Sequence, residues 1–252
     1  MRDPAVSAVP TGEPADSWEL WRSLPDPLPA EAIIAANQPR EDAASHRSYT
    51  YRGWEFAVPP GVFSPGRTSE LVFDRLLDGT IELAGRSYVV MGCGLGVEAV
   101  IAANRGAREV HALDVHPDSV RATAGHFARL VGEPSATTLV PTTSELFDRF
   151  PASARADVIT FNPPAVSETV SDNPDIIRNM CVGSGVVLRF LDQIAERDLL
   201  TPGGEIYVVL STTAELRRIT GHAIERGFTV EVAHSQGWRG SDVRTYLFRL
   251  RR

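Results

Sequence analysis

From Ser87 to the end of the chain, short apolar runs typical of strands alternate with segments of helical pattern. This alternation predicts βαβ units and a mostly parallel sheet with helices on both faces. The last two runs, FTVEVAHS and VRTYLFRL, are joined only by a loop, and they must be antiparallel because parallel neighbours need a long crossover. We therefore expect an α/β fold, with a Rossmann-like, doubly wound, seven-stranded sheet that is mostly parallel and has an antiparallel last strand.

The residues before this pattern have a different character. Residues 1–16 mix Pro, Gly, Ala and acidic residues without periodicity, so we expect a disordered tail. Residues 17–80 predict two short helices, a hairpin over SYTYRGWEFAVPP, and a helix from about Ser69 to Leu77 that Gly79 ends. This small N-terminal helical and hairpin extension leaves residues 81–252 as the main domain.

Composition restricts the environment and the partners that we expect. No apolar stretch approaches the ~20 residues of a membrane helix, and Cys93 and Cys181 are too few for a disulfide scaffold or a zinc site. We therefore expect a cytoplasmic protein with no metal and no membrane partner. The net charge of -7 disfavours a nucleic acid, because phosphate neutralisation supplies most non-specific affinity. A small molecule or short peptide is the expected substrate, and the oligomeric state stays open.

The segment VVMGCGLGVEAV places Gly92, Gly94 and Gly96 between a predicted strand and the next helix. Glycines there permit a tight turn and the close approach of a ligand to the N–H groups of a helix start. Such a loop holds either the pyrophosphate of a dinucleotide or the carboxylate of S-adenosylmethionine (SAM). The dinucleotide pattern needs a glycine where this chain has Val97. The spacing therefore favours SAM, with S-adenosylhomocysteine as the product.

Two further polar groups follow predicted strands. Asp114 ends the strand HALDV, and its carboxylate is suited to both hydroxyls of a ribose. Asn162-Pro163-Pro164 follows the strand ADVITF on the same edge of the sheet. Prolines lack an N–H and fix φ, so this segment is rigid. It holds the Asn162 carbonyl, as a free acceptor, beside the Asn162 side chain, and the Pro163 carbonyl is a candidate for a second free acceptor. This cluster of acceptors suits an amide or amine N–H donor whose lone pair faces a methyl sulfonium.

Because of these motifs, residues 51–252 resemble class I SAM-dependent methyltransferases of the Asn-Pro-Pro type, in particular the release-factor glutamine methyltransferase group. YRGWEFAVPPGVFSPGRTSELV resembles that group's hairpin and following segment, and TSELF resembles the segment that lies along the adenine. The resemblance implies that Asn162 and Pro163, with Pro164, form the catalytic motif. The expected cofactor-binding residues are Gly92, Cys93, Gly94, Gly96, Asp114, Val115, Ser144, Glu145, Leu146 and Asn162.

Three features depart from that group. The motif is followed by Ala165 where an aromatic residue usually stacks on a planar target, and Val90 replaces an acidic residue that usually precedes the glycine loop. The region before the hairpin is also shorter than the partner-docking domain of protein methyltransferases. Other residues would then contact the substrate, and the candidates are Tyr51, Phe63, Arg67, Ser69, Ala165 and Trp238.

We therefore expect an enzyme that methylates an amide or amine nitrogen of a small molecule or short peptide in a biosynthetic pathway. Glutamine methylation of a release factor is the alternative within enzymes. A SAM-binding regulator without catalysis is a second alternative, and a nicotinamide-dependent dehydrogenase is disfavoured by Val97. The polar segment VSETVSDNPDIIRN after the motif is either a lid over the substrate or an ordinary loop.

Overall fold

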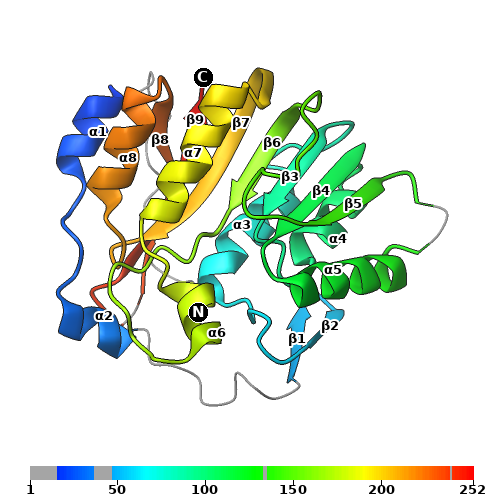
Figure 1. Cartoon of the computed structure of the whole chain (residues 1–252), viewed down its shortest axis with the longest axis horizontal. Coiled ribbons are helices and arrows are strands. Elements are labelled where there is room, and N and C mark those ends of the chain that lie inside the picture. The colour runs from blue at the N-terminus through cyan, green and yellow to red at the C-terminus, as the bar shows by residue number, and fades with distance from the viewer. Residues whose placement is uncertain (1–15, 37–46, 133–134, 239) are drawn as a thin grey trace, which may run out of the picture.

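The computed structural model describes residues 16–36, 47–132, 135–238 and 240–252 (Figure 1). Its strands are β1 (Arg47–Tyr51), β2 (Trp54–Val58), β3 (Ser87–Met91), β4 (Glu109–Asp114), β5 (Thr138–Thr143), β6 (Ala156–Phe161), β7 (Leu200–Ser211), β8 (Thr229–Gly237) and β9 (Arg244–Arg251). Its helices are α1 (Ser17–Ser23), α2 (Ala30–Ala36), α3 (Arg67–Asp78), α4 (Val97–Asn104), α5 (Pro117–Leu130), α6 (Pro174–Met180), α7 (Gly185–Arg197) and α8 (Leu216–Glu225).

A seven-stranded sheet of order β5-β4-β3-β6-β7-β9-β8 forms the centre of the molecule, and β1 and β2 pair separately as a hairpin. The pairs from β5 across to β7 are parallel, whereas β9 is antiparallel to both β7 and β8. The expected fold class is therefore confirmed. The position of β9 between β7 and β8 is a tertiary feature that the order of elements in the sequence does not specify.

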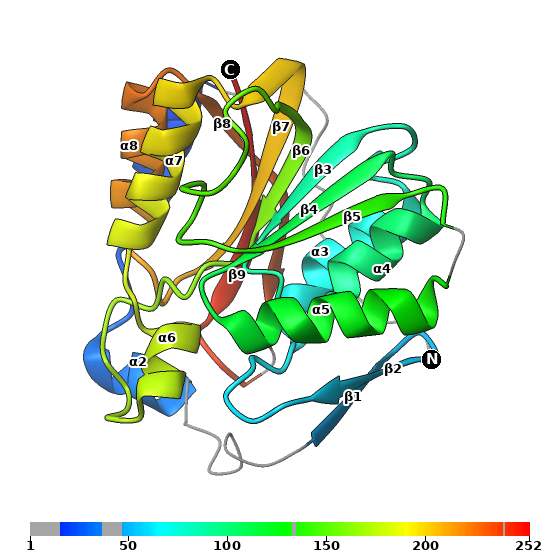
Figure 2. The same cartoon turned by 45° about the vertical axis from the view of Figure 1, so that its right-hand side comes forward.

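Helices cover both faces of this sheet (Figures 1 and 2). Val89 and Met91 of β3 pack in the core beneath α7 and α8, and Tyr88 and Val90 pack in the core beneath α3, α4 and α5. Because both faces are buried, β3 is apolar along almost its whole length instead of alternating with polar residues. Val90 is thus enclosed on the α4 side.

The N-terminal elements attach to the main domain at two separate places. Trp21 of α1 donates through Nε1 to the Arg217 carbonyl of α8 at 3.0 Å, whereas the β1–β2 hairpin packs on α5. Asp16 caps α1 through Trp18 N–H, and the rest of the expected tail, residues 1–15, lies outside the described residues. The domain boundary expected after residue 80 stays a prediction.

Within the described ranges, no helix is both long and apolar enough to cross a bilayer.

An aromatic cluster supports the strand that carries the Asn-Pro-Pro motif. The ring of Phe190, from α7, lies 4.8 Å from that of Phe161 and 5.5 Å from that of Phe147, measured between centroids. Phe190 is fully buried, and Phe161 directly precedes Asn162. The cluster therefore fixes the end of β6 against α7.

Replacing Phe190 with Ala should lower the free energy of unfolding by about 3–5 kcal/mol, because truncating a buried aromatic ring removes its contacts and leaves a cavity. Urea unfolding measures the change. Ile34→Ala, at a side chain that is 46% exposed, is the matched large-to-small control and should change stability by less than about 1 kcal/mol. Equal effects of the two substitutions would contradict this description of the core.

A buried polar cluster joins β3, β6 and α4 behind the motif. The Tyr88 hydroxyl lies 2.5 Å from Thr160 Oγ1, and both hydroxyls lie within 3.2 Å of the Glu98 carboxyl oxygen Oε2. The three oxygens make three mutual contacts, but the hydroxyls of Tyr88 and Thr160 supply only two hydrogens. A third hydrogen, on the Glu98 carboxyl, would allow every contact to be a hydrogen bond. Burial raises the pKa of Glu98 to about 7, which agrees with this proton count.

The carboxyl of Glu98 should make stability depend on pH. Its pKa is raised above the ordinary value of 4.5, so its contribution is complete below pH 4.5 and is lost as the pH rises towards 7. The neutral isostere Glu98→Gln should remove that part of the dependence, at most about 3 kcal/mol, in urea unfolding across this range. The exposed substitution Glu196→Gln should retain it. Parallel curves for wild type and Glu98→Gln would disprove the assignment.

Candidate active site

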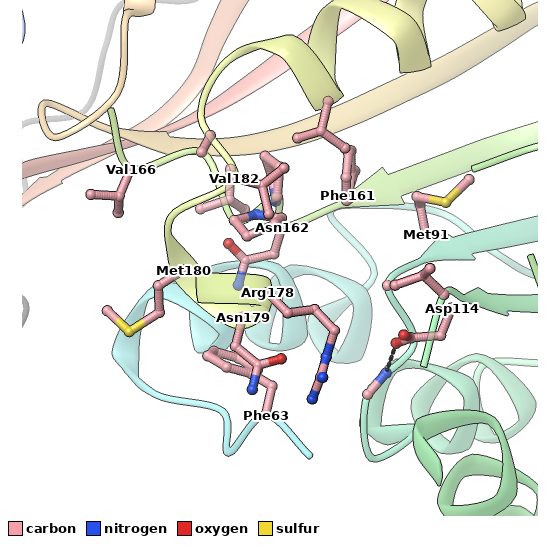
Figure 3. A pocket seen from close by; sticks show the side chains of 18 of the residues that line it. Phe63, Met91, Asp114, Phe161, Asn162, Val166, Arg178, Asn179, Met180 and Val182 are labelled. Carbon is pink, nitrogen blue, oxygen red and sulfur yellow. Dashed lines mark hydrogen bonds between the residues drawn. The ribbon is translucent and has the colours of Figure 1, made fainter. Parts of the chain in front are cut away.

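A cavity of about 440 Å³ opens at the carboxyl ends of the parallel strands. Its lining comes from the ends of β3, β4, β6 and β7, from the segment after β5, from α6, and from the beginnings of α3, α5 and α7. Figure 3 shows Asp114, Asn162 and Arg178 projecting into this space from different elements. The volume lies within the range of small-molecule sites, roughly 300–1,000 Å³.

The glycine loop forms one wall of the cavity. Gly92 and Gly94 line it, whereas Cys93 and Gly96 lie outside its lining. Gly96 has a φ of +79°, and a Cβ at this position would meet the backbone of Thr123 at 2.9 Å. The Cys93 thiol is buried, its Sγ lies 3.2 Å from Thr123 Oγ1, and burial raises its pKa. The loop is therefore seated on α5, with two of its glycines facing the cavity.

Asp114 ends β4 beside this loop. Its Oδ2 accepts from Gly94 N–H at 3.0 Å, and its Oδ1 accepts from His116 N–H at 2.8 Å. Burial raises the pKa of Asp114, and the two N–H donors oppose that effect. A carboxylate oxygen has a second lone pair, so both oxygens can still accept a hydroxyl hydrogen from a ribose.

The segment after β5 forms the neighbouring wall. Ser144 N–H donates to the Asp114 carbonyl at 2.9 Å, which fixes this segment against the end of β4. Ser144, Glu145 and Leu146 line the cavity, as does Val115, whose side chain is 54% exposed. Exposed apolar side chains such as Val115 provide a surface for a planar ring. The binding roles expected for these residues stay predictions.

Asn162 is held by a residue of α3. Its side-chain Nδ2 donates to Ser69 Oγ of α3 at 3.1 Å, and Ser69 is buried. An amide presents its nitrogen and its oxygen in different directions. With Nδ2 directed to Ser69, Oδ1 is left as an acceptor at the cavity that Asn162 lines.

The carbonyls of the motif are partly occupied. Pro163 C=O accepts from Ala165 N–H at 2.8 Å, and Pro164 C=O accepts from Val182 N–H at 2.8 Å. A carbonyl has two lone pairs, so Pro163 C=O can accept a second hydrogen bond. The expectation of two free carbonyls is thus modified, because one of them already closes a turn with Ala165.

The six substrate-side candidates separate into two groups. Phe63 and Ala165 line the cavity, whereas Tyr51, Arg67, Ser69 and Trp238 lie outside its lining. Tyr51 is buried and donates to Asp74, and the Arg67 guanidinium lies 5.6 Å from the centre of the Trp238 ring. Ser69 contacts Asn162 instead of the cavity. The substrate contacts expected for these four side chains stay predictions.

Several lining residues were not anticipated from the sequence. Arg178, Asn179 and Met180 come from α6, and the first two lie within the polar segment interpreted as a lid or a loop. Arg178 donates to the Gly61 carbonyl at 2.7 Å and pairs with Asp175 at 2.9 Å. Ser211, at the carboxyl end of β7, could have been predicted from the sequence as a lining residue, because β7 neighbours β6 and ends on the same edge of the sheet.

Among the described residues, no group of three or more His, Cys, Asp or Glu is placed to hold a metal ion.

Comparisons with known proteins agree with this geometry. The chain is 23% identical over 186 residues, 72% of its own length and 88% of the relative, to a Methanocaldococcus jannaschii protein whose name assigns it as a protein N5-glutamine methyltransferase. Among solved structures it resembles an E. cuniculi Mtq2–Trm112 complex responsible for methylation of the termination factor eRF1. That match has a TM-score of 0.54 and 18% identity over 76% of this chain and 99% of the other.

A second solved structure is the T. thermophilus 16S rRNA N2 G1207 methyltransferase with AdoMet and guanosine. Its TM-score is 0.56 and its identity 22%, over 82% of this chain and 50% of that one. At these identities the two solved structures support the fold alone.

These findings overturn the expected partners. We expected a small molecule or short peptide and excluded nucleic acid, but the proteins that this chain resembles are described as acting on rRNA and on a protein factor. The expectation was wrong because net charge is a property of the whole surface. It does not report the charge at the cavity, where Arg178 and Arg189 line the wall together with Asp114 and Glu145.

Residues 53–237, more than half of the chain, match the family described as methyltransferase small domain. That match covers the glycine loop, Asp114 and the Asn-Pro-Pro motif. The fold, the cavity at the strand ends and the relatives point to the same chemistry. The chain belongs to the methyltransferase small domain family and is a SAM-dependent methyltransferase.

Proposed function

We propose that this enzyme methylates the side-chain amide nitrogen of a glutamine in a protein. The observation that carries the proposal is the Asn162 amide, which is fixed by Ser69 so that Oδ1 is an acceptor at the cavity. A glutamine amide has two N–H donors and therefore matches Asn162 Oδ1 together with Pro163 C=O. The M. jannaschii relative, named for the same chemistry, supports this choice.

The residues present fit the cofactor that the family uses. Gly92 and Gly94 allow its methionine portion to approach the loop backbone, and Asp114 has acceptors for the ribose hydroxyls. Val115 and Leu146 supply apolar surface for the adenine. When bound there, SAM supplies an activated methyl group on a positively charged sulfur.

The protein's contribution to the transfer is alignment. Hydrogen bonds from the glutamine N–H groups to Asn162 and Pro163 would direct the nitrogen lone pair at the methyl carbon. A bound SAM would exchange its S–C bond for the new N–C bond and leave a neutral sulfur, and the proton released from the nitrogen would pass to solvent at the open cavity. Holding the two reactants in line can supply roughly 7–11 kcal/mol in the best intramolecular models, without a metal or a covalent intermediate.

The acceptor end of the cavity suits an aliphatic amide. Phe63, Val166, Met180 and Val182 line the same cavity as Asn162, and they offer apolar contacts to the methylene groups of a glutamine (Figure 3). These apolar contacts together with the Asn162 acceptor support a glutamine side chain as the acceptor.

The direct test uses purified translation termination factor with its Gly-Gly-Gln loop and labelled SAM. We expect label on that glutamine by peptide mass spectrometry, and none on a factor with Gln replaced by Asn, whose amide is one methylene shorter. Ribosomal RNA and tRNA serve as competing acceptors in parallel reactions. Label on RNA with none on the protein would refute the proposed acceptor while leaving the methyltransferase assignment intact.

Asn162→Ala should lower kcat about 100-fold, because the acceptor that orients the amide is lost, while the affinity for SAM changes by less than about threefold. Steady-state kinetics and calorimetry separate the two quantities. The control is Asn104→Ala, which removes an amide that bonds only to its own helix, Val100 C=O, at 2.9 Å. A large loss of SAM affinity with unchanged kcat would assign Asn162 to the cofactor instead.

Ser69→Ala should lower kcat about tenfold, because the freed Asn162 amide can turn its N–H groups towards the acceptor, and Ser69→Thr should restore most of it. In an Asn162→Ala background the effect of Ser69→Ala should disappear. Thr220→Val removes a buried hydroxyl of α8 that bonds within its own helix, and it should leave kcat unchanged. Additive effects of the two site substitutions would show that Ser69 acts elsewhere.

A further inference from the structure

One face of α5 holds the carbonyls of the glycine loop. Thr123 Oγ1 donates to Gly94 C=O at 3.2 Å, and one turn later His126 Nδ1 lies 2.8 Å from Leu95 C=O. These two contacts act on consecutive peptide groups of the loop. The conformation of the glycine loop therefore depends on α5 as well as on the glycines.

His126 also reaches the hairpin. Its other ring nitrogen, Nε2, accepts from Ala57 N–H of β2 at 3.1 Å, and the ring of Phe56 packs edge-on against it at 5.2 Å between centroids. Only 7% of His126 is exposed. Figure 2 shows the hairpin lying along α5, on the side of this helix away from the sheet.

The two partners of His126 determine where its proton lies. A backbone N–H only donates and a backbone C=O only accepts, so Nδ1 must carry the hydrogen and Nε2 must be bare. A charged imidazolium would point a second N–H at Ala57 N–H. The arrangement is therefore complete only when the ring is neutral and in the Nδ1–H tautomer.

The hairpin is in turn attached to the element that holds the Asn-Pro-Pro motif. Tyr49 and Tyr51 of β1 donate to Glu70 and Asp74 of α3, at 3.2 and 2.8 Å. Ser69, the partner of Asn162, lies on the same helix. A continuous set of contacts thus leads from the glycine loop through His126 and the hairpin to α3.

We propose that His126 is a positioning residue that couples the β1–β2 hairpin to the cofactor-binding glycine loop, and that it acts only as the neutral Nδ1–H tautomer. The proposal rests on the glycine loop as the cofactor site and is independent of the identity of the acceptor. Loss of the hairpin contact releases Leu95 C=O from its oriented donor and weakens cofactor binding. The hairpin thereby contributes to SAM affinity without touching SAM.

The surroundings keep the ring neutral. Burial lowers the pKa of His126, the positive charge of Arg129 lowers it further, and the hydrogen bond to Leu95 C=O partly opposes both effects. Arg129, on the same helix, bonds to the Glu55 carbonyl of β2, and the Glu55 side chain is exposed. On the loop side the titratable group is the Cys93 thiol, whose pKa is raised. On the neighbouring helix α4 the acid is Glu98, which shares its proton with Tyr88 and Thr160.

The sign of the pH effect follows from this lowered pKa. The contact is complete above the ordinary histidine pKa of 6.5 and is lost as the pH falls through the lower value in the folded protein. The affinity for cofactor should therefore fall in the acidic range. His116, whose pKa burial also lowers, is retained in every variant below, so its contribution is common to all of them.

The first measurement is an NMR spectrum of the imidazole nitrogens in the full chain labelled with ¹⁵N-histidine. The His126 signals are assigned by their loss in His126→Phe or, if that variant does not fold, in His126→Gln. At about pH 7.5 His126 should carry one proton, on Nδ1, which is the rarer tautomer of free neutral histidine. A proton on Nε2, or a charged ring, would overturn the proposal whatever the enzyme methylates.

The second measurement is calorimetric binding of S-adenosylhomocysteine between about pH 8 and pH 5. Ala57→Pro removes the N–H donor and should weaken binding about tenfold at pH 8, whereas Ala57→Gly retains the N–H and should bind like wild type. His222→Gln removes a histidine that bonds to Asp192 on the far helices and should leave the pH profile unchanged. Equal affinity of Ala57→Pro and Ala57→Gly would refute the coupling, and the readout requires no acceptor.

Discussion

Parallel pairing of three strands in one register is the constraint on which the site depends. Met91 of β3 pairs with Leu113 of β4 and with Phe161 of β6, so the residues that follow these positions emerge side by side. Those residues are Gly92, Asp114 and Asn162. A shift of one residue in either pairing would turn the buried side chains of a strand to the opposite face. The apolar contacts that fix the register thereby also set the distance between the cofactor loop and the acceptor motif.

A second layer of side chains then fixes the orientation of these groups. Ser69 directs the Asn162 amide, while Thr123 and His126 direct the carbonyls of the glycine loop. Each of these side chains is buried, and each contacts a loop instead of the cavity. Loops at the rim of a sheet have few interactions of their own, so precise geometry there requires partners from the covering helices. In this molecule α3 and α5 provide them, and the hairpin connects the two helices.

The differences from the release-factor group also have structural settings. Val90 lies in the core between β3 and the helices on the α4 side, where it is 2% exposed. Ala165 pairs with Cys181 in an isolated bridge, which fixes the chain after the motif against the end of α6. The lining residues Met180 and Val182 flank that bridge and occupy the acceptor end of the cavity. The acceptor surface is therefore built from a segment that carries no recognisable motif.

By itself the sequence determined the strand–helix alternation, the parallel sheet and the edge at which the glycine loop, Asp114 and Asn162 lie. These features follow from local periodicity and from the rule that parallel strands end together, both of which can be read within short segments. The tertiary structure alone decided which side chains hold that edge, since Asn162 and Ser69 are 93 residues apart and His126 and Ala57 are 69 apart. It also decided the contacts of Tyr51 with Asp74 and of Arg67 with Trp238, because these contacts depend on how distant elements pack. Local patterns specify elements and their ends, whereas contacts between distant residues exist only after the chain has folded.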